Sequence, residues 1–337
     1  MSILEDILAK PKPAIAEIQA IRQLVHQDFA AVNQLILEQL HSNIAMIEDI
    51  EQHLIHGGGK RLRPLIMLLA THGLDYPGQD HIKLATIIEF IHTATLLHDD
   101  VVDTSDMRRG RQTANAIWGN SASVLVGDFI YSRAFQIMAT LPHARIMQVL
   151  ADATNVIAEG EVLQLINCNN AALTEDTYFK VIHHKTAKLF EAAAQLAAIL
   201  AQRDQQTENA LASYGLNLGI AFQIMDDVLD YSATTAQMGK NQGDDLADGK
   251  ATLPIIYAMH QSSPTIAKVI EQSIQQANID NLPIIIEAIE STNALDYCRQ
   301  KAHQHITQAI EALTVMPTST YRDAMEQLAH FAIERDH

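Results

Sequence analysis

The stretch IIEFIHTATLLHDDVVD covers residues 87–103, and a second stretch of the same form, IAFQIMDDVLD, covers residues 220–230. Each is a long apolar run that ends in three aspartates. The six carboxylates are those of Asp99, Asp100, Asp103, Asp226, Asp227 and Asp230. On a helix of about 3.6 residues per turn, the first and last aspartates of each cluster stack, and the middle one lies within about 100° of them. The two stretches therefore predict two facing helices, each with three carboxylates on one face.

Carboxylates crowded in this way repel each other, and burial would raise their pKa values unless a cation lies between them. A hard divalent ion fills that role. Mg²⁺ is the expected cofactor, because it is commonly held by a few carboxylates and completes its shell with phosphate oxygens of a substrate. The competing interpretation is a pair of solvated acidic helix ends, but the runs 87–97 and 220–225 are too apolar for exposed faces.

The composition excludes several classes of protein. The chain has 337 residues, of which 23 are basic and 40 acidic, and a formal net charge of −17. This balance argues against a nucleic-acid partner and suits a protein that sequesters cations. Two cysteines, Cys168 and Cys298, imply no disulfide framework. With no signal-peptide pattern and no run of about eighteen apolar residues to span a bilayer, we expect a cytoplasmic protein.

Apolar residues recur at helical spacing through most of the chain, for example at Leu189, Ala193, Leu196 and Leu200. Alternating strand patterns are hard to find. The periodic runs cover residues 18–55, 65–73, 82–103 and 121–141, with shorter ones from residue 255 onwards. We expect an all-α, single-domain bundle of about a dozen helices over residues 1–337, with active groups that project inward into a central cavity.

A basic segment, GGGKRLRP, occupies residues 57–64. It fails the Walker A pattern, because no Ser or Thr follows Lys60 and no strand precedes the loop. We interpret it as a loop that delivers Lys60 and Arg63 to a diphosphate at the start of a helix, where Pro64 can occupy the first turn. Ordinary basic surface is the alternative.

Two more basic segments lie close to the aspartates in sequence. Arg108 and Arg109 follow the first cluster, and guanidinium groups bind phosphate in a bidentate manner, although salt bridges to the aspartates would also explain them. Lys185 lies in HHKTAK, residues 183–188, within an otherwise apolar helix, which is a poor place for lysines unless they face a pocket.

The second cluster is also flanked by polar residues. Gln223 lies about one turn before Asp226 and can orient a ligand by hydrogen bonds. The loop of residues 239–250 carries Lys240 and Lys250, which could close over a diphosphate. It fails the calcium-loop template, because apolar Leu246 stands at a ligand position.

Taken together, these motifs resemble those of the trans-isoprenyl diphosphate synthases over essentially the whole chain. The matching segments are residues 58–64, 97–103, 108–110, 185–186, 222–230 and 249–254. The resemblance implies a homodimer of the isoprenoid synthase type, with Mg²⁺ held by Asp99, Asp103 and Asp226. It assigns isopentenyl diphosphate to Lys60, Arg63, His92 and Arg109. It assigns the allylic diphosphate to Arg108, Lys185, Thr186, Gln223 and Lys240, and catalysis to the six aspartates and Lys185.

The implied activity is a head-to-tail addition of isopentenyl diphosphate, in trans, to an allylic diphosphate such as farnesyl diphosphate. Preorganised cations stabilise charge on the departing diphosphate, the isopentenyl double bond attacks the allylic carbon, and the released diphosphate takes the proton. The apolar product makes a transient membrane contact for its release plausible.

Product length in this family depends on the fourth and fifth residues before the first aspartate. Here they are Thr95 and Ala94, both small, so the tunnel should stay open. Residues 89–98 are most similar to those of octaprenyl diphosphate synthases, which make quinone side chains such as that of ubiquinone. Met138 and Leu150 are further candidates for the tunnel floor, with simple core packing as the alternative.

Three other functions compete with this one. A carboxylate-bridged di-iron bundle would use Glu-x-x-His pairs, of which residues 38–41 and 89–92 are examples, but it leaves both aspartate clusters unexplained. A terpene cyclase normally has a second metal motif of mixed Asn, Ser and Glu type, whereas the second cluster of this chain consists of aspartates. A silent regulatory subunit usually lacks one aspartate cluster, and both are intact here.

Overall fold

The computed structural model describes residues 13–57, 59–232 and 242–334. Its longer helices before the second aspartate cluster are α2 (Pro13–Gln23), α3 (His26–Leu40), α4 (Ala45–His56), α5 (Leu62–Gly73), α6 (Asp80–Val102), α8 (Asn120–Met138), α9 (Ala144–Asn167), α10 (Glu175–Ile182) and α11 (Lys188–Leu200). They are followed by α12 (Gln205–Ser232), α15 (Leu253–Gln261), α16 (Pro264–Gln276), α17 (Leu282–Ser291), α18 (Ala294–Ala312) and α19 (Thr320–Ile333). The all-α prediction is confirmed.

The remaining elements are short. They are α7 (Ala114–Trp118), α14 (Asp244–Ala247), the π-helix η1 (His183–Ala187), the 3₁₀ helix η2 (Leu313–Val315), and a two-stranded antiparallel hairpin of β1 (Met107–Arg108) and β2 (Arg111–Gln112). Among the described residues, no helix is both long and apolar enough to cross a membrane.

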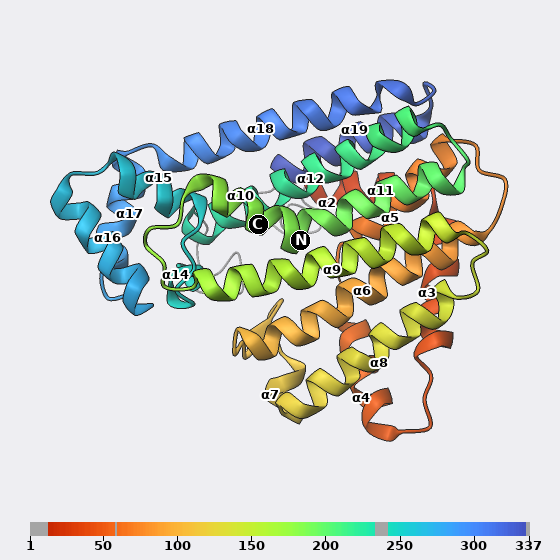
Figure 1. Ribbon diagram of the computed structural model, residues 1–337, viewed down its shortest axis with the longest axis horizontal. Helices are drawn as coiled ribbons and strands as arrows, with labels where there is room; N and C mark the ends of the chain where they lie inside the picture. Colours follow the sequence, from red (N-terminus) through yellow and green to blue (C-terminus); the bar gives the residue numbers. More distant parts are fainter. Residues whose placement is uncertain (1–12, 58, 233–241, 335–337) are drawn as a thin grey trace, which may run out of the picture.

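The helix α5 lies at the centre of the bundle. Its side chains from Leu65 to Ala70 are all inaccessible to solvent, as expected for a helix that is apolar on every side. It packs against α6, α11 and α19. Figure 1 shows α18 along one side of the molecule and α8 along the other, with α12, α11, α9 and α6 between them.

The pair α11–α12 depends on a close backbone approach. A Cβ atom at Gly215 of α12 would lie 2.2 Å from the carbonyl oxygen of Phe190 in α11. Only glycine allows the two helices to approach this closely, because the clashing atom belongs to the backbone and cannot rotate away. This contact brings α12, which carries the second aspartate cluster, to its position beside α11.

One buried carboxylate in α4 makes the stability of the fold depend on pH. Glu51 is 6% exposed, and its Oε1 atom has no hydrogen-bond partner among the described residues. Burial, together with the nearby charge of Glu48, raises the pKa of Glu51 to about 7, although Arg133 opposes the shift. The folded protein therefore retains a proton over a pH range in which the unfolded chain has released it, and stability falls as the pH rises through this range.

We expect Glu51→Gln to stabilise the protein at about pH 8, where the wild-type carboxylate is ionised, and to have little effect near pH 4.5, below the folded and close to the unfolded pKa. The gain should be about 1–2 kcal/mol, less than the full pKa shift implies, because solvent screens a partly buried charge. Urea denaturation at both pH values measures it. Glu287→Gln, on an exposed position of α17, is the control; an equal effect of both variants at both pH values would contradict the prediction.

Candidate active site

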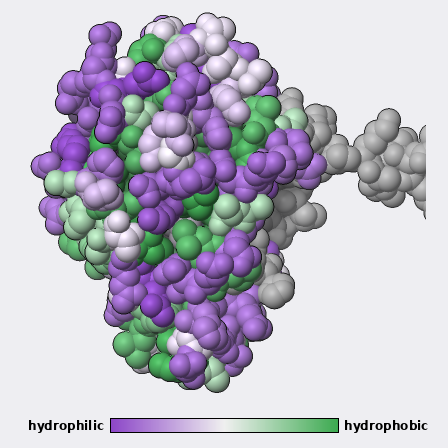
Figure 2. All heavy atoms as spheres, turned by 90° about the vertical axis from the view of Figure 1, so that its right-hand side faces the viewer, coloured by the Kyte–Doolittle hydropathy of each residue, from purple (hydrophilic) through white to green (hydrophobic). Residues whose placement is uncertain are grey.

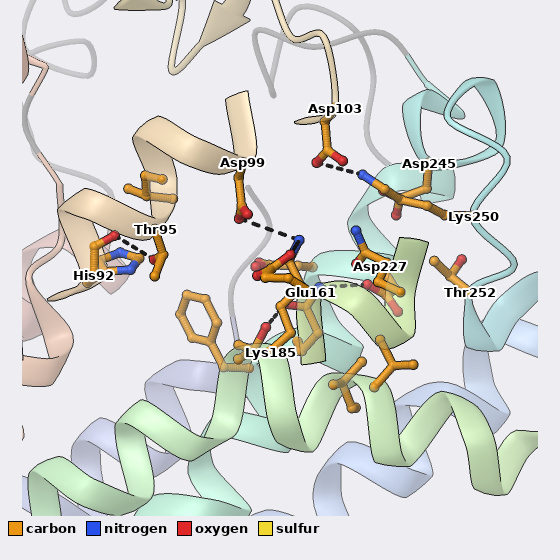
Figure 3. A pocket seen from close by; sticks show the side chains of 18 of the residues that line it. His92, Thr95, Asp99, Asp103, Glu161, Lys185, Asp227, Asp245, Lys250 and Thr252 are labelled. Carbon is orange, nitrogen blue, oxygen red and sulfur yellow. Dashed lines mark hydrogen bonds and ion pairs between the residues drawn. The ribbon is translucent and has the colours of Figure 1, made fainter. Parts of the chain in front are cut away.

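A cavity of about 760 Å³ opens between α5, α6, α9, η1, α12 and the segment that contains α14 (Figure 3). Part of its wall is charged and carries two aspartates of each cluster and several basic residues. The rest is apolar, and its members include Leu96, Leu173, Val181, Ile182, Phe190 and Phe222. A wall with both charged and apolar parts suits a substrate with an anionic head and a hydrocarbon chain.

The first aspartate cluster presents two of its three carboxylates to the cavity. Asp99 lies in the last turn of α6, and Asp103 caps the C-terminus of that helix. The ammonium group of Lys185 lies 3.4 Å from Asp99 Oδ2, and that of Lys250 lies 2.9 Å from Asp103 Oδ2 (Figure 3). Each carboxylate that faces the cavity thus already has a cation beside it.

Asp100 points away from the cavity. Its Oδ1 atom accepts hydrogen bonds from Nε and Nη2 of Arg108, at 2.8 and 2.7 Å. Burial raises the pKa of Asp100 in spite of this guanidinium. The salt-bridge alternative for the arginines is therefore realised at Arg108, which nevertheless also lines the cavity.

The second cluster faces the first from α12. Asp226 and Asp227 line the cavity, whereas Asp230 is buried outside its wall and lies 3.4 Å from the backbone N–H of Asp245, which donates to it. Asp227 accepts hydrogen bonds from the Tyr178 hydroxyl at 2.6 Å and from Gln223 Nε2 at 2.9 Å. Burial is the main cause that raises the pKa of Asp227 well above its usual range, and the charge of Asp245 is the second. Asp226 is the other carboxylate of this cluster in the cavity wall and is the candidate ligand from α12.

Lys185 reaches the cavity from the π-helix η1. π-Turns are rare and often occur at functional sites. A Cβ atom on Gly160 of α9 would lie 2.7 Å from the backbone nitrogen of Lys185, so glycine permits α9 and η1 to approach each other. Thr186, the next residue, donates to Gln223 Oε1 at 3.0 Å. The turn thereby directs two consecutive polar side chains into one wall of the cavity.

Lys185 also contacts a carboxylate that the sequence did not single out. Its Nζ atom lies 2.6 Å from Glu161 Oε2. Although burial favours the neutral amine, Asp99 and Glu161 raise the pKa of Lys185 overall, so it remains cationic. Burial and the neighbouring Asp99 raise the pKa of Glu161 to about 7.

A second group of basic residues forms another part of the cavity wall. Its members are Lys60, Arg63, His92 and Arg109. The Arg63 guanidinium donates to His92 Nε2 at 3.3 Å and lies 4.2 Å from the centre of the Phe190 ring. Burial lowers the pKa of Arg63 to about 10, and burial together with Arg63 lowers the pKa of His92 well below its usual value. His92 is therefore neutral beside a charged arginine and accepts its hydrogen bond.

The oxygen atoms of Asp99, Asp103 and Asp226 form a donor set that fits a hard divalent cation. They come from two facing helices and line one cavity, and the two lysines beside the first cluster show that the cluster needs positive charge. That these three carboxylates hold the ion stays a prediction.

The residues predicted to set chain length divide into two groups. Thr95 lines the cavity beside His92, and Figure 3 shows both on α6. Ala94, Met138 and Leu150 are buried in the packed core and are not part of the cavity wall. Lys240, predicted to bind the allylic diphosphate, lies outside the described residues.

Some residues of the cavity wall were missed by the sequence reasoning. They include Glu161, Tyr178, Asp245 and Thr252. Asp245 lies in DDLAD, residues 244–248, which has the spacing of the two aspartate clusters, and Thr252 lies in the matching segment 249–254, so the sequence did carry a signal for these two. Glu161 and Tyr178 carry no such signal and are brought to the cavity by the tertiary structure.

Comparisons with known proteins agree with this geometry. The profile of the polyprenyl synthetase family matches residues 44–291. Octaprenyl diphosphate synthase of Escherichia coli K12 is 51% identical over 320 residues, which cover 95% of this chain and 99% of that protein. All-trans-nonaprenyl-diphosphate synthase of Rhodobacter capsulatus is 44% identical over 318 residues, 94% of this chain and 98% of that one. The crystal structure of a polyprenyl synthase from Caulobacter crescentus CB15, complexed with calcium and isoprenyl diphosphate, superposes with a TM-score of 0.91 at 43% identity and covers 95% of this chain and 98% of that one.

Proposed function

The chain belongs to the polyprenyl synthetase family and is a trans-polyprenyl diphosphate synthase, and from this premise we propose that it extends an allylic primer to octaprenyl diphosphate with Mg²⁺ as cofactor. The observation that carries the proposal is that one cavity combines facing aspartates, two basic groups and apolar wall residues. The similarity to octaprenyl diphosphate synthases supports the product length.

The charges of the cavity support separate roles for its two basic groups, with one group for each substrate. Lys60, Arg63, His92 and Arg109 would bind isopentenyl diphosphate. Arg108, Lys185, Thr186, Gln223 and, by resemblance, Lys240 would bind the allylic diphosphate next to Asp99. Neutral His92 donates through the ring nitrogen that does not accept from Arg63, and the guanidinium groups bind phosphate oxygens in a bidentate manner.

Divalent ions held by Asp99, Asp103 and Asp226 would supply positive charge that stabilises the departing diphosphate. The residues of the chain complete this environment. Lys185 keeps its charge in the cavity and is aimed at the same position as Asp99. The rings of Phe190 and Phe222 exclude water, which would otherwise quench the allylic cation. We assign the final proton removal to the released diphosphate.

The proposal also covers the organisation of the protein. A single continuous core supports one catalytic domain over residues 1–337. Exposed apolar side chains of α7, α8 and α9 support a homodimer through these helices, and they are Ile117, Val124, Leu125, Phe135, Met147, Val162, Leu165 and Ile166.

Light scattering should show a dimer that Leu125→Asp weakens and Ile284→Asp, on α17, does not. A wild-type monomer would contradict the homodimer.

The function is tested by incubation of the purified chain with farnesyl diphosphate, isopentenyl diphosphate and Mg²⁺, followed by separation of the dephosphorylated products by length. A dominant octaprenyl product is expected. A different single length would retain the chemistry and refute the length, whereas folded protein without any elongation would refute the proposed function.

Substitution at the cavity wall should shorten the product. We expect Thr95→Phe to give shorter chains while turnover persists, because Thr95 lines the cavity and the larger ring would take up part of its volume. We expect Ala94→Phe to shorten the product too, with a loss of stability of about 1–3 kcal/mol because it overpacks a buried site. Thr95→Val, which preserves volume, is the control. An unchanged product distribution from active Thr95→Phe and Ala94→Phe enzymes would rule out control of length at this position.

A further inference from the structure

Two histidines and one carboxylate converge at the opposite end of α6 from Asp99. Asp28 of α3, His72 of α5 and His81 of α6 each place one potential ligand atom within 4.8 Å of the others. His81 Nε2 lies 3.0 Å from Asp28 Oδ2, and His72 Nε2 contacts the same oxygen. His81 precedes Asp99 by eighteen positions, or about 27 Å along the helix at 1.5 Å per residue. The cluster is therefore separate from the active-site cavity, whose wall contains none of the three residues.

The three side chains are held in place by their surroundings. The His72 ring stacks on Tyr321 of α19 at 5.0 Å and 19°, and the His81 ring meets Tyr76 edge-on at 5.8 Å. His81 is 4% exposed, and His72 is 34% exposed. The cluster is thus buried on the His81 side and open to solvent on the His72 side. The connection between α5 and α6 lies at the right-hand end in Figure 1, and Figure 2 shows that hydrophilic residues cover much of that end.

The three ligand atoms are close enough together for one cation. Hydrogen bonding alone does not satisfy the cluster, because His81 Nδ1 is buried without a partner among the described residues. A buried nitrogen of this kind calls for a water as its partner, because an ion held through Nε2 would not contact it.

We propose that Asp28, His72 and His81 form a site for a zinc-class divalent ion that joins α3, α5 and α6. Two imidazole nitrogens and one carboxylate oxygen are a zinc donor set, with a water in the fourth position on the open His72 side. Mg²⁺ prefers oxygen ligands, so this site differs in selectivity from the aspartate clusters. Both histidines then coordinate through Nε2, and each carries its proton on Nδ1.

The test compares zinc binding by the full-length chain and by variants, after removal of metals with a chelator. The aspartate clusters are present in every protein, so zinc bound there cancels in the comparison. We expect wild type to bind one more zinc ion per chain than His72→Gln or His81→Gln. Affinity at this site should fall by at least about 100-fold, since even loss of an outer-shell partner costs about 10- to 100-fold. His303→Gln, at an exposed position of α18, should bind as wild type does.

Two further measurements test the site without any assay of enzyme activity. Co²⁺ in place of Zn²⁺ should give visible absorption bands in wild type that are absent from His72→Gln, and Zn²⁺ should raise the melting temperature of wild type more than that of this variant. His72 is half-buried, so His72→Gln remains informative if His81→Gln fails to fold. Equal zinc stoichiometry, Co²⁺ spectra and melting shifts in wild type and His72→Gln would overturn the proposal.

Discussion

Asp99→Asn is expected to lower kcat for chain elongation by roughly 10³-fold while the protein stays folded. Removal of a single group that stabilises transition-state charge commonly costs about 10²–10³-fold in kcat, and Asp99 would in addition hold the cation that does so. Asn keeps the shape of the side chain but supplies no negative charge. The fold should tolerate the change, because it relieves repulsion between Asp99 and the nearby carboxylate of Glu161. Initial rates of isopentenyl diphosphate incorporation at saturating Mg²⁺ measure the effect.

The matched control is Asp128→Asn on α8, whose side chain is 64% exposed. It removes the same charge outside the cavity and should leave kcat within about twofold, as surface substitutions away from special features usually do. Metal affinity should fall in Asp99→Asn and not in Asp128→Asn. If Asp99→Asn keeps more than about a tenth of the wild-type rate, or if both variants bind metal equally well, Asp99 is not the ligand that this prediction requires.

Helical periodicity was sufficient to predict several of the helices, among them α6, which carries the first aspartate cluster. The runs 82–103 and 121–141 correspond to α6 and α8 with small differences at their ends. The run 18–55 is divided among α2, α3 and α4, and no Pro or Gly in this interval marks the breaks. The packing of α3 onto α6 is a tertiary contact, which local periodicity does not reveal. The π-turn of η1 likewise depends on the approach of α9 at Gly160.

The candidate site was predictable in outline, but the roles within each cluster were not. The helical wheel places three carboxylates of each cluster on one face, yet Asp100 turns to Arg108 and Asp230 is covered by the segment around Asp245. The middle aspartate of a cluster is offset from the others by about 100° around the helix axis. This is enough for a neighbouring guanidinium to form a salt bridge with it. Glu161 was missed because nothing near it in sequence resembles a cluster; its partner, Lys185, is 24 residues away.

Lys185→Gln is expected to raise the KM for the allylic diphosphate more than about tenfold and to lower kcat by about 10²-fold, which corresponds to about 2.7 kcal/mol of lost stabilisation. In the free protein its ammonium group lies 3.4 Å from Asp99 and 2.6 Å from Glu161, and it stays charged although it is buried. A cation held there forms charge-assisted hydrogen bonds to a diphosphate, which a neutral amide replaces only weakly. Steady-state kinetics with farnesyl diphosphate varied at saturating isopentenyl diphosphate separate the two effects.

Metal binding distinguishes this role from that of the aspartates. Without the ammonium group, Asp99 and Glu161 face each other as like charges, so the affinity of the free enzyme for Mg²⁺ should be equal to or higher than that of wild type, opposite to the loss expected for Asp99→Asn. Lys180→Gln, on an exposed position of α10, removes the same charge outside the cavity and should leave KM, kcat and metal affinity unchanged. A Lys185→Gln enzyme with weakened Mg²⁺ binding and an unchanged KM for the allylic substrate would mean that the lysine organises the metal ligands instead of binding the diphosphate.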